Sequence, residues 1–254
     1  MNNNQITTKE CEGAQIQYLE KEFLEVKSYS KEIGIYLKGL TGQKSNLSEE
    51  EWIYVRTNHF KEYFGDWERY FKCQFLLKGP VVCTLTGEEF APIEGKNLTD
   101  RVVEYFKGIG GMAYSPFFGN VILNKKGVDD SIGHGVGRNK AIAFAAVKDV
   151  IENGVLVDYD KNHKGRGYDG AVISAPIEIK EERYICSVVI TRMKDNRFYL
   201  HEVIEQKKLS DEGSNSVQRQ PQRLKAFAKI LQNILSAKDL QINISLDKNG
   251  EPMY

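Results

Sequence analysis

The stretch from Ala171 to Ile204, AVISAPIEIKEERYICSVVITRMKDNRFYLHEVI, decides the fold. It belongs to three runs rich in β-branched and aromatic residues, at 168–179, 183–192 and 197–205. Short turns separate the runs, which is the pattern of strands that pair with their neighbours along the chain. The stretch therefore predicts an antiparallel meander, and a run at 155–159 brings the expected sheet to about four strands.

The residues before this sheet predict a long helix. Between Arg138 and Glu152, apolar residues recur at helical spacing. They are Ile142, Ala145, Ala146 and Val150, and Gly154 follows as a cap. A helix followed by a meander gives a compact two-layer arrangement. We expect the α+β class, with N-terminal helices and then a helix packed on an antiparallel meander sheet of about four strands.

Helix signals also mark the first half of the chain. Residues 8–40 are expected to be helical, and Ser48 with Glu51 has the spacing of a capping box. Thr57 is expected to cap a short helix that ends at Gly65, and Thr99 a helix that begins with DRVVEYFK.

Changes in composition suggest four segments. These are a helical leader at 1–47, a helical and aromatic segment at 48–95 that contains FGDWE, an α+β core at 96–209, and a tail at 210–254. The tail is expected to hold a mobile polar connection and a helix at 224–237.

The composition excludes some classes of protein. Lys plus Arg and Asp plus Glu both number 35, so a partner that requires a strong overall charge is not indicated. No apolar run approaches the roughly 20 residues needed to cross a bilayer. The 4 cysteines form no CxxC pair, which argues against a zinc ribbon. We expect reduced thiols, a cytoplasmic location and no membrane partner.

Histidine is the side chain best suited to move protons near neutral pH. Of the 4 histidines, His59 lies beside an aromatic cluster and is expected to be structural. His134 lies in SIGHGVGRNK, where glycines permit close approach of a ligand and Arg138 and Lys140 follow at a helix start. The alternative is a glycine-rich turn with surface charges.

His163 lies in a dense basic loop, DKNHKGRGYDG. Lys164 and Arg166 are candidates to bind phosphate, and Tyr168 is a candidate to stack or to donate a hydrogen bond. An ordinary solvated loop is the alternative, because neighbouring aspartates partly neutralise it.

His201 lies in RFYLHEV. Regular alternation along a strand places Arg197, Tyr199 and His201 on one face of the sheet. Glu202 then faces the helix, where a lone charge needs a partner. The alternative is a His201 that is simply hydrogen-bonded in a second buried layer. No HxxxH or HExxH spacing links the histidines, so we predict neither a metal site nor a cofactor.

Three blocks of the sequence are familiar in combination. TNHFKEYFGDWE resembles a segment of large polyvalent proteins from phages and conjugative elements. VILNKKGVDDSIGHGVGRNKAIAFAAVKDVIENG, with KNHKGRGYDGAVISAPIEI and NRFYLHEVI, resembles one of their associated domains. That domain family is similar to the barnase–EndoU–colicin–RelE-like nucleases. The resemblance covers roughly residues 57–207. It implies a barnase- or RelE-like fold for the core and metal-independent RNA cleavage.

The sequence thus leads to a first hypothesis, a nuclease-like domain of a mobile element that cleaves or binds RNA. His201 and His134 would be the acid–base pair, with Tyr199 beside them. The expected substrate-binding residues are Arg138, Lys140, His163, Lys164, Arg166, Tyr168 and Arg197. A cognate immunity protein is a further expected partner.

Two other hypotheses stay open. One is a non-catalytic effector that binds and inhibits a host defence protein through its aromatic N-terminal half, although such aromatics are more often core. The other is a structural linker module. The C-terminal LDKNGEPMY resembles the lead-in to an ADP-ribosyltransferase domain, but the sequence stops before the signature of that domain.

Overall fold

The computed structural model describes residues 3–162, 165, 167–207, 244–248 and 251–253. The chain divides into two compact units. The first comprises Met1–Gly39, Gln43–Trp67 and Gln241–Tyr254, and the second comprises Leu40–Gly42 and Glu68–Leu240. The predicted mobile connection and helix between 210 and 237 lie outside the described residues.

The first unit is built from helices and one small hairpin. Its elements are α1 (Asn3–Glu32), α2 (Glu49–Tyr54), α3 (Asn58–Phe64), β8 (Ser245–Leu246) and β9 (Pro252–Met253). The capping box of Ser48 and Glu51 is confirmed at the start of α2. Thr57 caps α3 by accepting from the backbone N–H of Phe60, as predicted. Gly65 ends α3 with a φ of 87°, a value that favours glycine.

The two tryptophans of the first unit lie in its core. Trp52 and Trp67 are both 0% exposed. Their indole N–H groups donate to the carbonyls of Lys38 (2.9 Å) and Val55 (2.7 Å). The Arg56 guanidinium lies 3.8 Å from the centre of the Trp52 ring, a cation–π contact. These side chains are therefore used for packing and are not available as an interaction surface.

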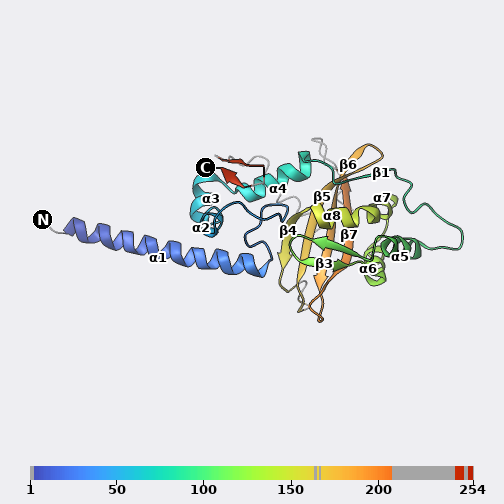
Figure 1. Cartoon of the computed structure of the whole chain (residues 1–254), viewed down its shortest axis with the longest axis horizontal. Coiled ribbons are helices and arrows are strands. Elements are labelled where there is room, and N and C mark those ends of the chain that lie inside the picture. Colours follow the sequence, from blue (N-terminus) through green and yellow to red (C-terminus); the bar gives the residue numbers. More distant parts are fainter. Residues whose placement is uncertain (1–2, 163–164, 166, 208–243, 249–250, 254) are drawn as a thin grey trace. The chain divides into compact units, whose positions relative to one another are not determined.

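The second unit holds the sheet (Figure 1). Its helices are α4 (Trp67–Lys78), which begins at the last residue of the first unit, α5 (Leu98–Gly108), α6 (Lys125–Gly133), α7 (Arg138–Ala143), the 3-10 turn η1 (Phe144–Ala146) and α8 (Val147–Asn153). Its strands are β1 (Cys83–Leu85), β2 (Met112–Ser115), β3 (Gly119–Ile122), β4 (Val155–Asp160), β5 (Gly170–Ile179), β6 (Glu182–Arg192) and β7 (Phe198–Lys207).

The predicted fold class is wrong. The described residues form a 7-stranded mixed sheet in the order β1-β5-β6-β7-β3-β2, with β4 also pairing β5. β5, β6 and β7 do pair antiparallel along the chain. However, β1 pairs β5 in parallel and β3 pairs β7 in parallel. The sheet is thus neither a four-stranded meander nor the barnase- or RelE-like arrangement that the resemblance implied.

The strands that complete the sheet are short, and two of them, β1 and β3, pair with strands that are distant in sequence. β1 has 3 residues and β2 has 4. β2 lies in GIGGMAYSPFFG, a stretch rich in turn-forming residues, and such composition favours a loop over a strand. Local periodicity carries no information about parallel pairing between residues as far apart as Cys83 and Ile177 or Val121 and Phe198.

Two helix predictions also need correction. The single helix expected from Arg138 to Glu152 is divided by η1 into α7 and α8. The N-cap of α5 is Asn97, whose side chain accepts from the backbone N–H of Asp100, and not Thr99. Helix α4 was not predicted at all.

The two faces of the sheet are covered by different helices. Apolar side chains of α4, among them Cys73 and Leu76, pack in one cluster with Val189 and Ile204. Helices α7 and α8 contact strands of the sheet as well, and Figure 1 shows them alongside β5, β6 and β7. This packing fixes β6 and β7 from both sides.

A β-bulge interrupts β7. Leu200 lies opposite Ile190 and Glu202 lies opposite Val189, so His201 is the extra residue between them. A bulge shifts the alternation of side chains by one position. The bulge therefore places Glu202 and Ile204 on the same face as Tyr199. This corrects the expectation from regular alternation, which put Glu202 on the opposite face.

Among the residues that the structure describes, no helix combines the length and apolar character needed to span a bilayer.

Candidate functional site

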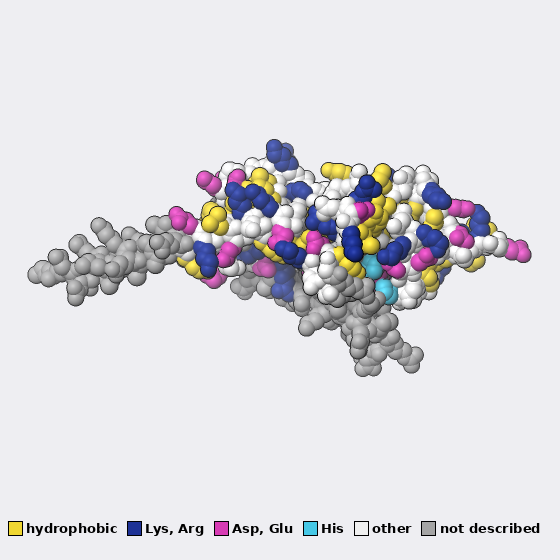
Figure 2. Space-filling view, turned by 90° about the horizontal axis from the view of Figure 1, so that it is seen from below, with side chains coloured by type: hydrophobic (Ala, Val, Ile, Leu, Met, Phe, Trp, Pro, Cys, Tyr) yellow, Lys and Arg dark blue, Asp and Glu magenta, His cyan; other side chains and the backbone are white. Residues whose placement is uncertain are grey.

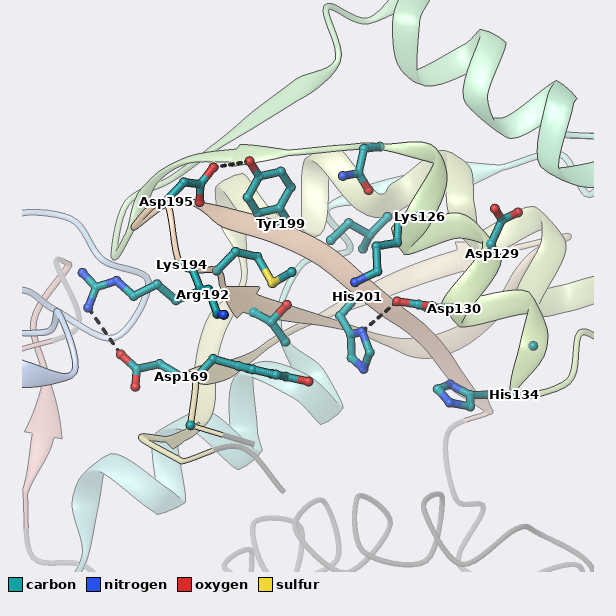
Figure 3. Close-up of a pocket in the computed structure, with 17 residues that line it drawn as sticks. Lys126, Asp129, Asp130, His134, Asp169, Arg192, Lys194, Asp195, Tyr199 and His201 are labelled. Carbon is teal, nitrogen blue, oxygen red and sulfur yellow. Dashed lines mark hydrogen bonds and ion pairs between the residues drawn. The ribbon is translucent and has the colours of Figure 1, made fainter. Parts of the chain in front are cut away.

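The second unit contains a pocket of about 1140 Å³ (Figure 3). Its walls come from α6, the 167–169 loop, the β6–β7 hairpin and the bulge of β7. The lining residues are Asn124, Lys126, Asp129, Asp130, Gly133, His134, Gly167, Tyr168, Asp169, Thr191, Arg192, Met193, Lys194, Asp195, Tyr199, Leu200 and His201.

Helix α6 is docked closely on β7 beside the bulge. A Cβ on Gly127 would lie 2.2 Å from the Leu200 carbonyl oxygen, so the approach requires glycine. Ser131 is 0% exposed, and its Oγ accepts from the backbone N–H of Val203 at 3.0 Å. The helix thus satisfies a backbone group of β7 beyond the part that pairs with β3, as a neighbouring strand would. This docking places His134, the C-cap of α6, next to the bulge.

The two histidines of the pocket each face a carboxylate. His134 Nδ1 lies 3.2 Å from Glu202 Oε1. His201 Nδ1 lies 3.4 Å from Asp130 Oδ2. The ring centroids are 6.2 Å apart, with the ring planes at 77°. Figure 3 shows both rings at one end of the pocket, with Asp130 above His201.

This arrangement orients the two imidazoles. A carboxylate beside Nδ1 fixes the orientation of the ring. Nε2 is then the nitrogen left to exchange a proton with a ligand. Nε2 of His201 is itself buried, so this ring must shift before that nitrogen can meet a ligand. The His134 side chain is 21% exposed and the His201 side chain 10%, so both rings lie at the pocket wall and not on the open surface.

Two lysines line the pocket from different elements. Lys126 comes from α6 and Lys194 from the β6–β7 turn, and both are exposed. Among the described residues, neither has a carboxylate within ion-pair distance. Figure 3 shows the Lys126 side chain directed toward His201. The pocket thus contains two cationic groups that can meet an anion.

The hairpin end of the pocket carries polar groups held by their neighbours. Asp169 Oδ2 accepts from the Tyr159 hydroxyl at 2.8 Å and from Arg192 at 3.3 Å. The Tyr199 hydroxyl donates to Asp195 Oδ2 at 2.5 Å. This hydrogen bond lowers the pKa of Asp195 and raises the pKa of Tyr199. Tyr199 is therefore held as a neutral hydroxyl at the rim.

Charged residues also lie behind the pocket. Lys140 is 8% exposed, and its ammonium donates to the Ser131 carbonyl at 2.7 Å. Burial lowers the pKa of Lys140, while Glu202 and Glu205 act in the opposite direction. Burial raises the pKa of Glu205, and the Lys140 charge partly opposes this. Lys140 is thus a buried cation whose pKa is influenced by the Glu202 and Glu205 carboxylates.

The structure brings together only some of the predicted site residues. His134, His201, Tyr199 and Tyr168 all line the pocket. Arg138, Lys140 and Arg197 do not. The Arg138 guanidinium donates to the carbonyls of Gly87 (2.7 Å) and Phe90 (3.2 Å). The predicted binding residues His163, Lys164 and Arg166 lie outside the described residues.

Sequence reasoning missed two sets of residues: the carboxylates that face the histidines, and the lysines that line the pocket. One signal was present for α6: Lys126, Asp130 and His134 are spaced four apart, which places them on one side of a helix. No such signal existed for the pairing of Glu202 with His134, because it depends on the bulge.

The three cysteines whose side chains the structure describes are not set up as nucleophiles. Burial and the nearby Asp149 carboxylate raise the pKa of Cys83 to about 12, which disfavours the thiolate. Cys73 and Cys186 are buried. Within the described part of the chain, no group of three or more His, Cys, Asp and Glu side chains is arranged to hold a metal ion.

Comparison with known proteins gives one family match. Residues 94–200 match the family described as Large polyvalent protein-associated domain 3. The match covers fewer than half of the 254 residues. It supports the association with polyvalent proteins and names no reaction. It includes His134 and Tyr199, while His201 and Glu202 lie just beyond its end. No curated protein and no solved structure matches the chain.

Proposed function

We propose that the pocket cleaves RNA by general acid–base catalysis without a metal ion. The observation that carries the proposal is the pair of imidazoles on one wall, each with Nδ1 beside a carboxylate and 6.2 Å apart between ring centroids. Two hydrogen bonds of roughly 2.6–3.2 Å to atoms on opposite sides of one phosphorus span a gap of this order. A single structural histidine would not require this arrangement.

The reaction has a simple balance. One imidazole takes the proton from a ribose 2′-hydroxyl, and the 2′-oxygen forms a bond to phosphorus. The bond from phosphorus to the 5′-oxygen breaks, and the other imidazole gives its proton to that oxygen. The products are a 2′,3′-cyclic phosphate and a free 5′-hydroxyl, and the next reaction begins after the two imidazoles exchange protons with water.

Lys126 and Lys194 supply positive charge in this proposal. Negative charge builds on the nonbridging phosphate oxygens as the 2′-oxygen attacks, and a nearby ammonium group stabilises it. The described structure supports these two lysines in the role that the sequence suggested for Arg138 and Lys140. Those two cations are bound to backbone carbonyls of the protein itself.

The first experiment is cleavage of mixed RNA in EDTA. We expect His134→Ala and His201→Ala each to lower the rate by about 10²–10⁴-fold, the usual contribution of general acid–base catalysis. His59→Ala is the matched control, since His59 lies in the first unit. Products should end in a 2′,3′-cyclic phosphate. Equal rates for the wild-type protein and His201→Ala on every RNA tried would refute catalysis by this pocket.

A second experiment assigns the two roles. An RNA with sulfur in place of the bridging 5′-oxygen leaves as a thiolate, which needs no proton from the enzyme. This substrate should restore the rate of the variant that lacks the acid and leave the variant that lacks the base impaired. If neither variant responds to the sulfur, proton donation to the leaving group is not performed by either imidazole.

The alternative, a non-catalytic effector, predicts different results in a cleavage assay and in a pull-down. An effector of a host defence protein would leave RNA intact and would retain a stoichiometric partner from host lysate after RNase treatment. Retention of such a partner by the His134→Ala, His201→Ala double variant, with no cleavage by the wild-type protein, would replace the nuclease proposal.

A further inference from the structure

The pocket has two chemically different ends. The catalytic end contains His134, His201, Asp130 and Lys126, from α6 and the bulge. The hairpin end is formed by the 167–169 loop, the Thr191–Asp195 stretch and Tyr199. Figure 3 shows Asp169 and Arg192 on the side of the pocket opposite His134. The proposed chemistry uses the catalytic end and Lys194, so Asp169 and the tyrosines of the hairpin end are open to another role.

Asp169 is a fixed hydrogen-bond acceptor at the hairpin end. Its Oδ2 accepts two donors, the Tyr159 hydroxyl and the Arg192 guanidinium. Among the described residues, Oδ1 has no donor. The side chain is 18% exposed. A carboxylate held in this way presents one oxygen in a set direction, which suits an N–H group of a ligand.

Flat and apolar surfaces accompany this acceptor. Tyr168 and Tyr199 both line the pocket and are partly exposed, and so is Met193. Aromatic side chains stack with nucleobases, and a thioether packs well against an aromatic ring. The carboxylate can accept a hydrogen bond from the edge of a base, and the aromatic and thioether side chains can pack against the face of the base.

The charges of the pocket limit how many phosphates it can contact. Four aspartates line it against Lys126, Arg192 and Lys194, and Arg192 is already paired with Asp169. On the face shown in Figure 2, Lys and Arg side chains alternate with Asp and Glu and do not form one basic stripe. Long nucleic acids are bound along such stripes. Among the described residues that line the pocket, Lys126 and Lys194 are the cations without an ion pair.

We infer that the hairpin end is a base-binding subsite and that the pocket takes a short single-stranded substrate, one base with the phosphates on its two sides. The volume of about 1140 Å³ lies near the upper limit of pockets for small ligands, roughly 300–1,000 Å³. This inference rests on the proposed function for the identity of the scissile group. Recognition itself requires no cleavage.

The test is binding of 2′-deoxy oligonucleotides, which lack the attacking hydroxyl and stay intact. A deoxydinucleotide and a single-stranded decamer should bind with similar affinity per site. Two phosphate contacts predict that raising salt from 50 to 200 mM weakens binding about sevenfold. A track of eight contacts predicts roughly 10³-fold. A steep salt dependence, or equal binding of a duplex, would overturn the inference.

Substitutions at the hairpin end test where the base binds. Tyr168→Ala should weaken binding of the dinucleotide by about fivefold or more, because a stacking surface is lost, and Tyr168→Phe should retain it. Asp169→Asn should weaken binding of bases that donate through N–H. Tyr114→Ala is the matched control, since Tyr114 is 60% exposed on β2 and is not part of the pocket. Unchanged affinity in both Tyr168→Ala and Asp169→Asn would refute the subsite.

The two proposals fail separately. Binding of the deoxydinucleotide without cleavage of the matching ribodinucleotide would refute the nuclease and keep the subsite. Cleavage of long RNA that Tyr168→Ala and Asp169→Asn do not alter, with no binding of short strands, would keep the nuclease and refute the subsite.

Discussion

Helices α6 and α7 lie close together in sequence, both contact β7 and both carry basic residues, yet they use those residues in opposite ways. In α7, Lys140 is buried against the Ser131 carbonyl and Arg138 is bound to the carbonyls of Gly87 and Phe90. In α6, Lys126 is exposed at the pocket. The cations of α7 are bound to backbone carbonyls of the protein, whereas Lys126 of α6 is available to a ligand. The lesson is that a basic residue in a sequence gains a role only once its burial is known.

The largest effect is expected where α6 meets β7. A side chain on Gly127 would overlap the backbone of Leu200, so Gly127→Ala should force α6 away from the strand. We expect the free energy of unfolding to fall by about 3 kcal/mol, as in overpacked cores. Gly133→Ala is the control on the same helix, because a Cβ there meets nothing within 4 Å. Denaturant titration of both variants measures the difference, and similar stabilities would show that α6 is not tightly docked.

A smaller effect should separate the two kinds of lysine. Lys140→Met removes a buried cation and leaves the Ser131 carbonyl without its charged donor. We expect a loss of about 2 kcal/mol, the range for hydrogen bonds to charged groups. Lys126→Met should change stability by less than about 0.5 kcal/mol and should weaken binding of the deoxydinucleotide. If Lys140→Met weakens binding while stability is unchanged, the contrast between the helices is wrong.

Ser131→Ala should cost about 1.5 kcal/mol, because the buried N–H of Val203 loses its acceptor. Hydrogen exchange at the Val203 amide is the sensitive measurement. Faster exchange there, with little change in β5, would indicate that α6 acts as the missing neighbour of β7. Unaltered exchange would mean that this hydrogen bond contributes little.

The smallest expected effect is a change in how the stability of the protein depends on pH, and it arises from Glu205. The raised pKa of Glu205 means that its ionised form is less favourable in the folded protein than in the unfolded chain. Its unfavourable contribution is complete above the raised pKa and disappears as pH falls toward the ordinary value. Glu205→Gln should therefore be more stable than the wild-type protein at neutral pH, and the difference should shrink on acidification. Thermal unfolding at several pH values measures it, and a constant difference would contradict the burial of Glu205.

The sequence predicted local features well and long-range features poorly. The caps at Ser48 and Thr57 and the antiparallel pairing of β5, β6 and β7 follow from short-range patterns, and these predictions are confirmed. The parallel pairings of β1 and β3 join segments far apart in sequence, and no local pattern encodes them. For this reason the predicted fold class was wrong although most strands were found.

The candidate site shows the same division. Glycines beside His134 and the polar stretch around His201 drew attention to two residues that line the pocket. The carboxylate partners could not be predicted, because regular alternation puts Glu202 on the other face of β7. One bulge reverses this and brings Glu202 within 3.2 Å of His134. A deviation from periodicity cannot be read from a pattern that assumes periodicity.

The position of His201 within the bulge has a genetic consequence. Deleting this one codon would leave Leu200 opposite Ile190 and Glu202 opposite Val189, so the ladder would close and become regular. An imidazole would vanish while the strands on either side kept their present neighbours. The scaffold can thus gain or lose half of its proposed proton-transfer pair by a single in-frame event, and active and inactive descendants of one ancestor could share the same architecture.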